Sequence, residues 1–488
     1  MTRFADGPNI SPTEIAQAAT QFRAASSPAA IFPITPREHH YGFLFEDLQA
    51  DPANLLKPDE NTAKNLINLG QLMVDPNPTD PAFDSKIPSA YTYLGQLIDH
   101  DVTRQSFTHP PPPLNERTLP LSLQEIHSIP NARSAGLDLD CIYGPAIEQG
   151  TSYEVPRDPN KTEKLKLERM AGLPPTPELP RERNSPHPAL IGDRRNDENL
   201  MISQLHLAFM LAHNKLVDQG ATFETARQTL RRHYQWMVVN DYLFKIADPD
   251  IVNAVLDGKL DQFDPPDDNN FMPLEFSVAA FRFGHSMIRD GYNYNGLFER
   301  APLLQLLLPG VLKEYNHVPL DWKIDWTRFV DGRNMARRFD TTLAQRLERL
   351  DDGQGHPLPF GLAAVDLLKG FLLRVPTGEA VARRLKETEL STADLLKVVS
   401  KEQGEVLSKS FAGRTPLWFY VLAEADASGT GRLGRVGSRI VASVLIGLVR
   451  KSKDSYLRIK GWSPTLGTQS RFDLPDLFQF ADLLRNDE

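Results

Sequence analysis

Apolar residues recur at intervals of three and four positions over several stretches of the chain, the spacing of one face of an α-helix. The clearest stretches are residues 90–101, 200–216, 276–287, 361–373 and 439–449. The strict alternation of apolar and polar residues that indicates β-strands is scarce, and no segment repeats along the chain. We therefore predict a mainly α-helical protein with long irregular loops.

Length and composition favour one large globular domain. The 488 residues are 41% apolar and 24% charged, which is sufficient for a large core. No Gly/Ser-rich linker separates blocks of different composition. We expect a single domain over residues 41–488, preceded by an N-terminal extension over residues 1–40.

Charge and the absence of long apolar runs argue against several function classes. The net charge is −9, with Lys and Arg scattered among acidic residues, which disfavours a nucleic-acid partner. No run approaches the ~18 apolar residues of a membrane span, and the first residues lack the features of a signal peptide. We expect no membrane span and a cytoplasmic location by default, with secretion by a non-classical route left open. The single cysteine, Cys141, cannot form an internal disulfide and is expected to be a small buried residue.

Residues 93–101, with the sequence YLGQLIDHD, place a dense group of polar side chains in an otherwise apolar helix. Gln96 and His100 are four residues apart and share one helical face, while Asp99 and Asp101 point to its flanks. A solvated helix end is the simplest interpretation of this pattern. Burying these groups instead needs a partner for each of them, because an unpaired buried polar group is costly.

Two chemical interpretations compete with the solvated helix end. Adjacent His100 and Asp101 would bind a cation in a metal-dependent phosphohydrolase of the HD type. Those enzymes need a further upstream histidine and a downstream aspartate, and nothing around His39 and His40 fixes that spacing. The second interpretation is more specific, because GQLIDHD resembles the distal-site motif of the animal-type haem peroxidases, of the peroxidase–cyclooxygenase superfamily.

Three further segments resemble this family, in the family's order. SAGLDLDCIYG (134–144) is similar to its calcium loop, GDRRNDENLMISQLHLAFMLAHNKL (192–216) to the helix with its catalytic arginine, and AAFRFGHSMI (279–288) to the helix with its iron-binding histidine. Two late segments, TPLWFYVLAEA and LGRVGSRIVASVLIGLV, look like the C-terminal part of bacterial members. The resemblance runs from about Tyr41 to the C-terminus. His206 and His213, which share a helical face with apolar residues, are interpreted as core histidines.

The resemblance implies a distal site made of three catalytic side chains. His100 would be the base that takes a proton from hydrogen peroxide and returns it to the departing oxygen, a task that suits a neutral imidazole. Arg195 would stabilise charge as the oxygen–oxygen bond breaks, because a guanidinium stays charged. Gln96, one turn before His100, would hold water or an anion.

On the proximal side, the resemblance makes His285 the axial ligand of the haem iron. Gly284 suits the close approach of a flat macrocycle. The family usually hydrogen-bonds this histidine to an asparagine, but the corresponding stretch, GLAAVDLLKGFLLRVP, has Asp366 there and Lys369 at the position of a usual arginine. We hypothesise that Asp366 gives the ligand imidazolate character and lowers the iron's potential.

The implied cofactors are haem b and calcium. Asp99 and Glu198 occupy the positions that form ester bonds to haem in mammalian members, and Asn199 replaces a methionine that forms a third link in one of them, so at most two links are expected. The calcium ligands carried over from the family are Asp101, Ser134, the Gly136 carbonyl, Asp138 and Asp140, which are oxygen donors suited to a hard cation. Asp140 stands where serine is usual.

The expected activity is reduction of hydrogen peroxide with a small phenolic or halide reductant. Fatty-acid oxygenases of the same superfamily place a radical-forming tyrosine three residues before the proximal histidine, where this chain has Arg282. Arg282 therefore disfavours oxygenation and is expected to lie at the cofactor. The HD-type phosphohydrolase and a relative that has lost haem remain alternatives.

Overall fold

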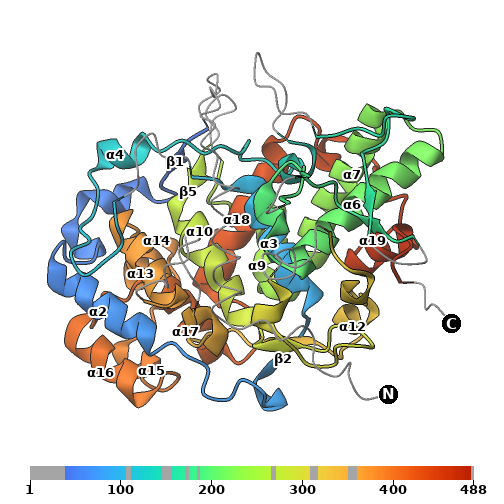
Figure 1. The fold of residues 1–488 in the computed structure, drawn as a ribbon. Coiled ribbons are helices and arrows are strands. Elements are labelled where there is room, and N and C mark those ends of the chain that lie inside the picture. The colour runs from blue at the N-terminus through green and yellow to red at the C-terminus, as the bar shows by residue number, and fades with distance from the viewer. Residues whose placement is uncertain are drawn as a thin grey trace, which may run out of the picture.

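The computed structural model describes residues 39–105, 112–144, 155–170, 175–183, 187–264, 271–307, 317–349 and 360–484. Helices dominate these residues, which confirms the predicted mainly α fold (Figure 1). The proposed N-terminal extension lies outside the described residues up to residue 38. The longer α-helices are α2 (Glu60–Gln71), α3 (Ala90–Val102), α6 (Leu200–Asp218), α7 (Phe223–Met237), α9 (Pro249–Leu256), α13 (Leu362–Leu372), α14 (Gly378–Leu385), α16 (Lys401–Ser410), α17 (Leu417–Ser428) and α18 (Arg435–Lys451).

Four of the five predicted helical stretches are α-helices, namely α3, α6, α13 and α18, whereas the fifth is not one continuous α-helix. Residues 276–287 divide into the end of α10 (Leu274–Ser277) and a 3-10 helix, η6 (Ala280–Met287). The backbone leaves helical dihedral angles between them, with φ −135° and ψ −86° at Ala279. A 3-10 helix has three residues per turn, so apolar residues at intervals of three fit it as well.

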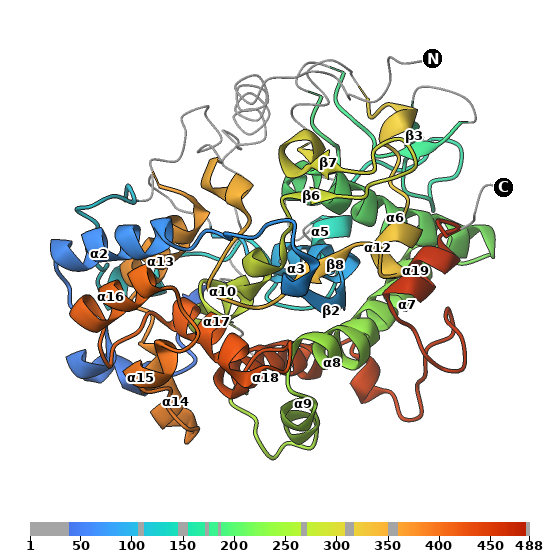
Figure 2. The ribbon, with the colours of Figure 1, turned by 90° about the horizontal axis from the view of Figure 1, so that it is seen from below.

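The helices form two peripheral groups around a central one. Figures 1 and 2 both show α2, α13, α14 and α16 at one end of the molecule and α6, α7 and the short α19 (Leu474–Phe480) at the other. Between them lie α3, α10, α17 and α18, which bring the distal and proximal sequence segments into the middle of the fold. Packing of α3 against α6 and η6 joins the three segments that carry the predicted site.

Burial explains why α6 and α18 form where they do. Side chains are buried almost all around α6 and α18, as expected for helices that lie inside a large domain. Each begins at a definite signal: Asn199 caps α6 by accepting a hydrogen bond from the backbone N–H of Ile202, and Glu424 accepts from the first backbone N–H groups of α18. The 3-10 helix η4 (Arg194–Asp197) precedes α6 directly and therefore lies at its N-terminus.

Strands are short and occur as four two-stranded sheets among the described residues. The pairs are β1 (Tyr41–Gly42) with β5 (Met272–Pro273) in parallel, and in antiparallel β2 (Asp84–Pro88) with β8 (Met335–Arg337), β3 (Glu168–Arg169) with β4 (Pro177–Glu178), and β6 (Gly291–Tyr292) with β7 (Ala301–Pro302). Within β1–β5, Tyr41 is opposite Met272, which fastens the start of the described chain close to α10.

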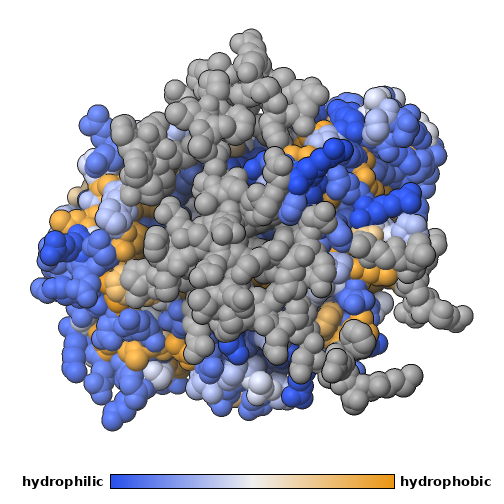
Figure 3. All heavy atoms as spheres, in the orientation of Figure 1, coloured by the Kyte–Doolittle hydropathy of each residue, from blue (hydrophilic) through white to orange (hydrophobic). Residues whose placement is uncertain are grey.

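The face of the molecule drawn in Figure 3 is mostly hydrophilic where it is coloured, with small separate hydrophobic areas. Among the described residues, no helix combines the length and the apolar character that crossing a bilayer requires.

Candidate active site

His100 lies near the end of α3 with its two ring nitrogens in different environments. Its side chain is buried, and Nδ1 lies 2.7 Å from Oδ1 of Asn196. Within the part of the chain that the structure describes, Nε2 forms no hydrogen bond. Burial, assisted by the nearby Arg195 guanidinium, lowers the pKa of His100 below its ordinary value of 6.5. The imidazole is therefore neutral at pH ~7 and has one nitrogen available for a reacting group.

Arg195 is fastened between an aspartate and the end of the distal helix. A guanidinium nitrogen lies 2.8 Å from Asp193 Oδ2 and donates to the carbonyl oxygens of His100 and Thr103 at 3.0 and 2.7 Å. Burial alone would raise the pKa of Asp193, but Arg133 and Arg195 hold it well below its usual range. Asp193 in turn raises the pKa of Arg195 against the effect of burial, so both groups stay ionised.

Gln96 and Glu198 are joined by a hydrogen bond. The Gln96 amide donates to Glu198 Oε1 at 2.7 Å, and the Asn199 amide donates to Gln96 Oε1 at 3.4 Å. Asp99 Oδ1 accepts from the Thr103 hydroxyl at 3.1 Å. Of the two carboxylates predicted to lie at the cofactor, Asp99 is on α3 with His100, and Glu198 directly follows η4, which carries Arg195.

His285 lies on η6 and is hydrogen-bonded to a buried carboxylate of α13. Its Nδ1 lies 2.6 Å from Asp366 Oδ2, and Arg282 donates to Asp366 Oδ1 at 2.7 Å. Burial would raise the pKa of Asp366, but His285 and Arg282 outweigh it and lower that pKa. The result is an ionised carboxylate that holds the proton on Nδ1 of His285. No described residue hydrogen-bonds to Nε2 of His285.

The surroundings of His285 fit a flat macrocycle. A Cβ added at Gly284 would meet no atom within 4 Å, so open space lies beside the backbone there. The His285 side chain is 27% exposed although η6 is otherwise largely buried. The Arg282 Nε is buried and has no hydrogen-bond partner, which leaves a donor for an anionic group. A free imidazole nitrogen, open space beside the backbone and an unsatisfied cationic donor fit a haem, whose iron needs an axial ligand and whose edge carries carboxylates.

Lys369 lies on α13, three residues after Asp366, and its charge is sensitive to the surrounding groups. Burial lowers its pKa from 10.5 to about 7, with a further contribution from Arg282 on the proximal side. Asp366 on the proximal side and Asp99 on the distal helix act in the opposite direction.

The residues predicted to bind calcium form a second acidic cluster behind α3. Asp101 accepts from the backbone N–H groups of Leu139 and Cys141 at 3.2 Å each, and burial with repulsion from Asp140 raises its pKa to about 7. The Ser134 hydroxyl donates to Asp138 Oδ2 at 2.9 Å.

The arrangement of this cluster is not yet that of a formed metal site. Asp138 Oδ1 is buried without a hydrogen-bond partner. No group of three or more His, Cys, Asp or Glu side chains among the described residues is positioned to hold a metal ion as it stands. Gly136 lies beside the side chains of Ser134 and Asp138. A cation at this loop would therefore have to draw the oxygen atoms closer together.

Two residues that fix the site geometry were not predicted from the sequence, Asp193 and Asn196. Both belong to the polar run GDRRND, and its density of charge at the start of a buried helix is the only signal that points to them. His206 and His213 are fully buried, as expected for core histidines, and Cys141 is buried as predicted.

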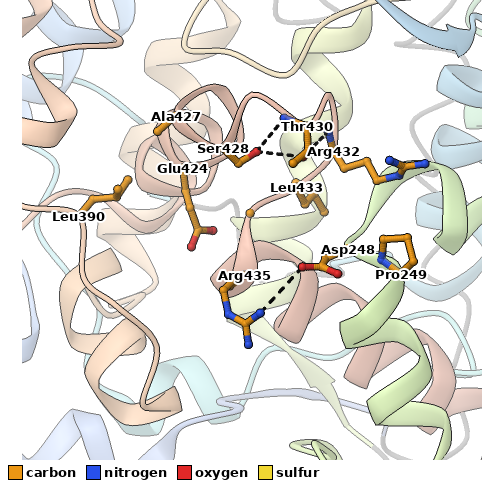
Figure 4. Close-up of a pocket in the computed structure, with 11 residues that line it drawn as sticks. Asp248, Pro249, Leu390, Glu424, Ala427, Ser428, Thr430, Arg432, Leu433 and Arg435 are labelled. Carbon is orange, nitrogen blue, oxygen red and sulfur yellow. Dashed lines mark hydrogen bonds and ion pairs between the residues drawn. The ribbon is translucent and has the colours of Figure 1, made fainter.

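A separate cavity of about 350 Å³ lies where α17 ends and α18 begins (Figure 4). Its walls include Glu424, Arg432 and Arg435, and an ion pair of 3.9 Å between Arg435 and Asp248 closes one side. None of the predicted site residues lines it, and it contains no histidine that could ligate iron.

Comparison with known proteins identifies the class to which this fold and site belong. The family model of the animal haem peroxidases matches residues 115–370, which is more than half of the chain. The chain belongs to the animal haem peroxidase family, as its sequence motifs indicated, and membership of this family implies a haem group.

Relatives with known names are distant. A peroxidase-like protein of Margaritifera margaritifera is 24% identical over 272 residues, which are 44% of this chain and 33% of that protein. The chorion peroxidase of Aedes aegypti is 24% identical over 195 residues, 37% of this chain and 24% of that protein. The chain spans about a third or less of the length of these relatives.

Solved structures share the fold over most of the chain. Peroxidase A of Dictyostelium discoideum covers 82% of this chain, with 84% of its own chain aligned, a TM-score of 0.58 and 15% identity. A fatty acid alpha-dioxygenase of Arabidopsis thaliana covers 88% of this chain, with 75% of its own chain aligned, a TM-score of 0.60 and 14% identity. At these identities the likeness establishes the fold, and the reaction has to be argued from the site.

Proposed function

We propose that this protein is a haem-dependent peroxidase that reduces hydrogen peroxide with electrons from a small phenolic or halide donor. Haem b would lie between α3 and η6, with His285 as the iron ligand and His100 as the base on the opposite side. One observation carries this proposal: two histidines on neighbouring elements each have Nδ1 fixed by a buried partner and Nε2 free of hydrogen bonds.

The side chains divide the reaction between them. When bound, haem iron would supply the centre that accepts an oxygen atom from peroxide and is then reduced by the donor. His100 would take the proton of the near peroxide oxygen at Nε2 and return it to the far one, because its lowered pKa keeps it neutral. Arg195 would stabilise the negative charge that develops, and its anchors to Asp193 and α3 fix it before the reaction.

Gln96 would take part through Glu198. Its amide nitrogen donates one hydrogen to that carboxylate, and the second hydrogen would hold water or an anion. Asp99 and Glu198 are the candidate ester-forming groups, and Arg282 and Lys369 are the cations that would face the haem carboxylates.

The direct experiment is a visible absorption spectrum of the chain expressed with a haem supply, before and after addition of hydrogen peroxide. We expect a ferric haem band that shifts with peroxide and returns when a phenol is added. A protein that stays colourless after haem reconstitution would refute the proposal and favour a member of the family that has lost haem.

A fatty-acid oxygenase is the second candidate, favoured by the fold of the Arabidopsis thaliana dioxygenase. Arg282 opposes it, because this residue stands at the position of the radical-forming tyrosine and is bound to Asp366. Oxygen uptake in the presence of a long-chain fatty acid, together with no oxidation of phenols by peroxide, would favour the oxygenase instead.

We also propose a calcium ion at Asp101, Ser134, Gly136, Asp138 and Asp140. The buried, unpartnered oxygen of Asp138 and the mutual repulsion of the carboxylates support it, because a cation would relieve both. Treatment with a chelator should lower the unfolding temperature, and calcium but not magnesium should restore it. An unfolding temperature that changes with neither the chelator nor calcium would contradict the proposed calcium site.

A further inference from the structure

One amide side chain connects two buried histidines behind the distal site. Asn196 of η4 is fully buried between His100 of α3 and His206 of α6. Its Oδ1 lies 2.7 Å from Nδ1 of His100, and its Nδ2 lies 3.0 Å from Nδ1 of His206. Three separate elements therefore meet at a single hydrogen-bonded chain of His100, Asn196 and His206.

The chemistry of an amide fixes the protons along this chain. The carbonyl oxygen only accepts and the NH₂ group only donates, so the two histidines must differ at Nδ1. His100 must carry a proton on Nδ1, which leaves Nε2 with a lone pair. His206 must have a bare Nδ1 and carry its proton on Nε2, an atom that is buried without a hydrogen-bond partner.

The structure assigns Asn196 as the positioning residue that sets the tautomer of His100, with His206 as the anchor that keeps the amide in the required orientation. The consequence of this inference is that Nε2 of His100 is ready to act as a base before peroxide arrives, and this consequence rests on the proposed peroxidase function. The hydrogen bonds themselves do not depend on haem.

The anchor is needed because an amide has two orientations that exchange Oδ1 and Nδ2. The reversed orientation would donate to His100 and place its proton on Nε2, where it would block the base. His206 opposes this reversal as long as its proton is on Nε2, because a bare Nδ1 can only accept; burial, which lowers its pKa to about 3, excludes the imidazolium form, which would donate from Nδ1.

The test reads the protons directly by proton–nitrogen NMR on the full chain, isotopically labelled in its histidine rings. Any bound haem is kept diamagnetic by reduction under carbon monoxide, and signals are assigned with His100→Gln and His206→Gln. We expect the proton on Nδ1 of His100 and on Nε2 of His206. A proton on Nε2 of His100 would overturn the inference.

Two substitutions separate the two halves of the amide. Asn196→Asp keeps an acceptor for His100 but removes the donor, so His206 should move its proton to Nδ1 while His100 stays unchanged. Asn196→Leu should leave His100 as a mixture of tautomers. His213→Leu, which removes another buried histidine of α6, is the matched control and should alter neither signal. An unchanged His100 signal in Asn196→Leu, or an unchanged His206 signal in Asn196→Asp, would refute the assignment.

The kinetic consequence distinguishes this inference from the proposed function. In the haem-loaded protein, Asn196→Asp should react with peroxide within about threefold of the wild-type rate and Asn196→Leu at least about tenfold more slowly, since a positioned base contributes roughly 100-fold or more. If the chain binds no haem, the proposed function is refuted, but the tautomers of His100 and His206 can still be measured by NMR. Normal peroxide reactivity in Asn196→Leu would refute only the role of Asn196.

Discussion

Replacing Asp366 by asparagine tests how the protein tunes its proposed iron ligand. Asp366 is 1% exposed and hydrogen-bonded to His285 at 2.6 Å, and its lowered pKa keeps it ionised. A carboxylate draws the Nδ1 proton and increases electron density at Nε2, which stabilises ferric over ferrous iron. Asparagine preserves the shape and an acceptor oxygen but removes the charge.

The size of the effect follows from the hydrogen bond that changes. A hydrogen bond to a charged group contributes about 1.5–3 kcal/mol and a neutral one about 0.5–1.5 kcal/mol. The difference of about 1–2 kcal/mol corresponds to about 40–90 mV for a one-electron couple, at 59 mV per tenfold change. Asp366→Asn should therefore raise the ferric/ferrous midpoint potential by that amount, measured by spectroelectrochemical titration.

A matched control distinguishes the effect of removing the charge beside the proposed iron ligand from the effect of losing a buried ion pair. Asp366→Asn also leaves Arg282 without its carboxylate, which should destabilise the fold by about 1–2 kcal/mol, less than for a fully buried pair because Arg282 is 22% exposed. Asp75 is similarly buried and paired with Arg337 at 2.7 Å. Asp75→Asn should lower stability and leave the potential unchanged. An unchanged or lowered potential in Asp366→Asn would refute the reasoning.

Further predictions address the base, the covalent links and the dependence of stability on pH. His100→Ala should slow the spectral change caused by peroxide by roughly 100- to 10,000-fold, and a rate near that of the wild type in stopped-flow measurements would exclude His100 as the base. Haem should remain with the wild-type protein in acidified organic solvent and leave completely in the double variant Asp99→Asn, Glu198→Gln; complete extraction from the wild type would exclude ester bonds. Burial raises the pKa of Glu275 from 4.5 to about 7, so the folded state holds a proton that the unfolded chain releases, and stability falls as pH rises through this window. Glu275→Gln should show a smaller loss between pH ~5 and ~8 in urea unfolding, and parallel losses in both proteins would contradict this.

The spacing of apolar residues correctly predicted the helices that bury either one apolar face or nearly their whole surface. α3, α6, α13 and α18 appear where the apolar spacing indicated them, because burying an apolar helix surface stabilises it wherever it packs. The stretch around His285 was predicted as one helix, but Ala279 departs from helical dihedral angles and η6 follows as a 3-10 helix. Spacing alone could not show this break, because it depends on how the segment packs between α3, α10 and α17.

Site residues that lie within a recognisable sequence motif could be predicted. Their hydrogen-bond partners from distant segments of the chain could not. His100 and Arg195 lie 95 residues apart in sequence, and their contact is made through a backbone carbonyl that no pattern reveals. The hydrogen bond between Asn196 and His100 likewise depends on tertiary packing, so no sequence pattern reveals it. Asp366 was noticed only as a departure from a resemblance, and its distance from His285 came from the fold.

The two histidines differ in the charge of the group at Nδ1, and this difference supports the roles proposed for them without reference to any relative. The partner of His100 is a neutral amide, which holds the proton on Nδ1 but adds no charge, so it does not offset the burial that lowers the pKa of this imidazole. The partner of His285 is an ionised carboxylate supported by Arg282, which makes Nε2 a stronger electron donor. A proton shuttle needs a group that both takes and releases a proton, whereas a metal ligand gains from added negative charge. His100 is therefore suited to the peroxide side and His285 to the iron.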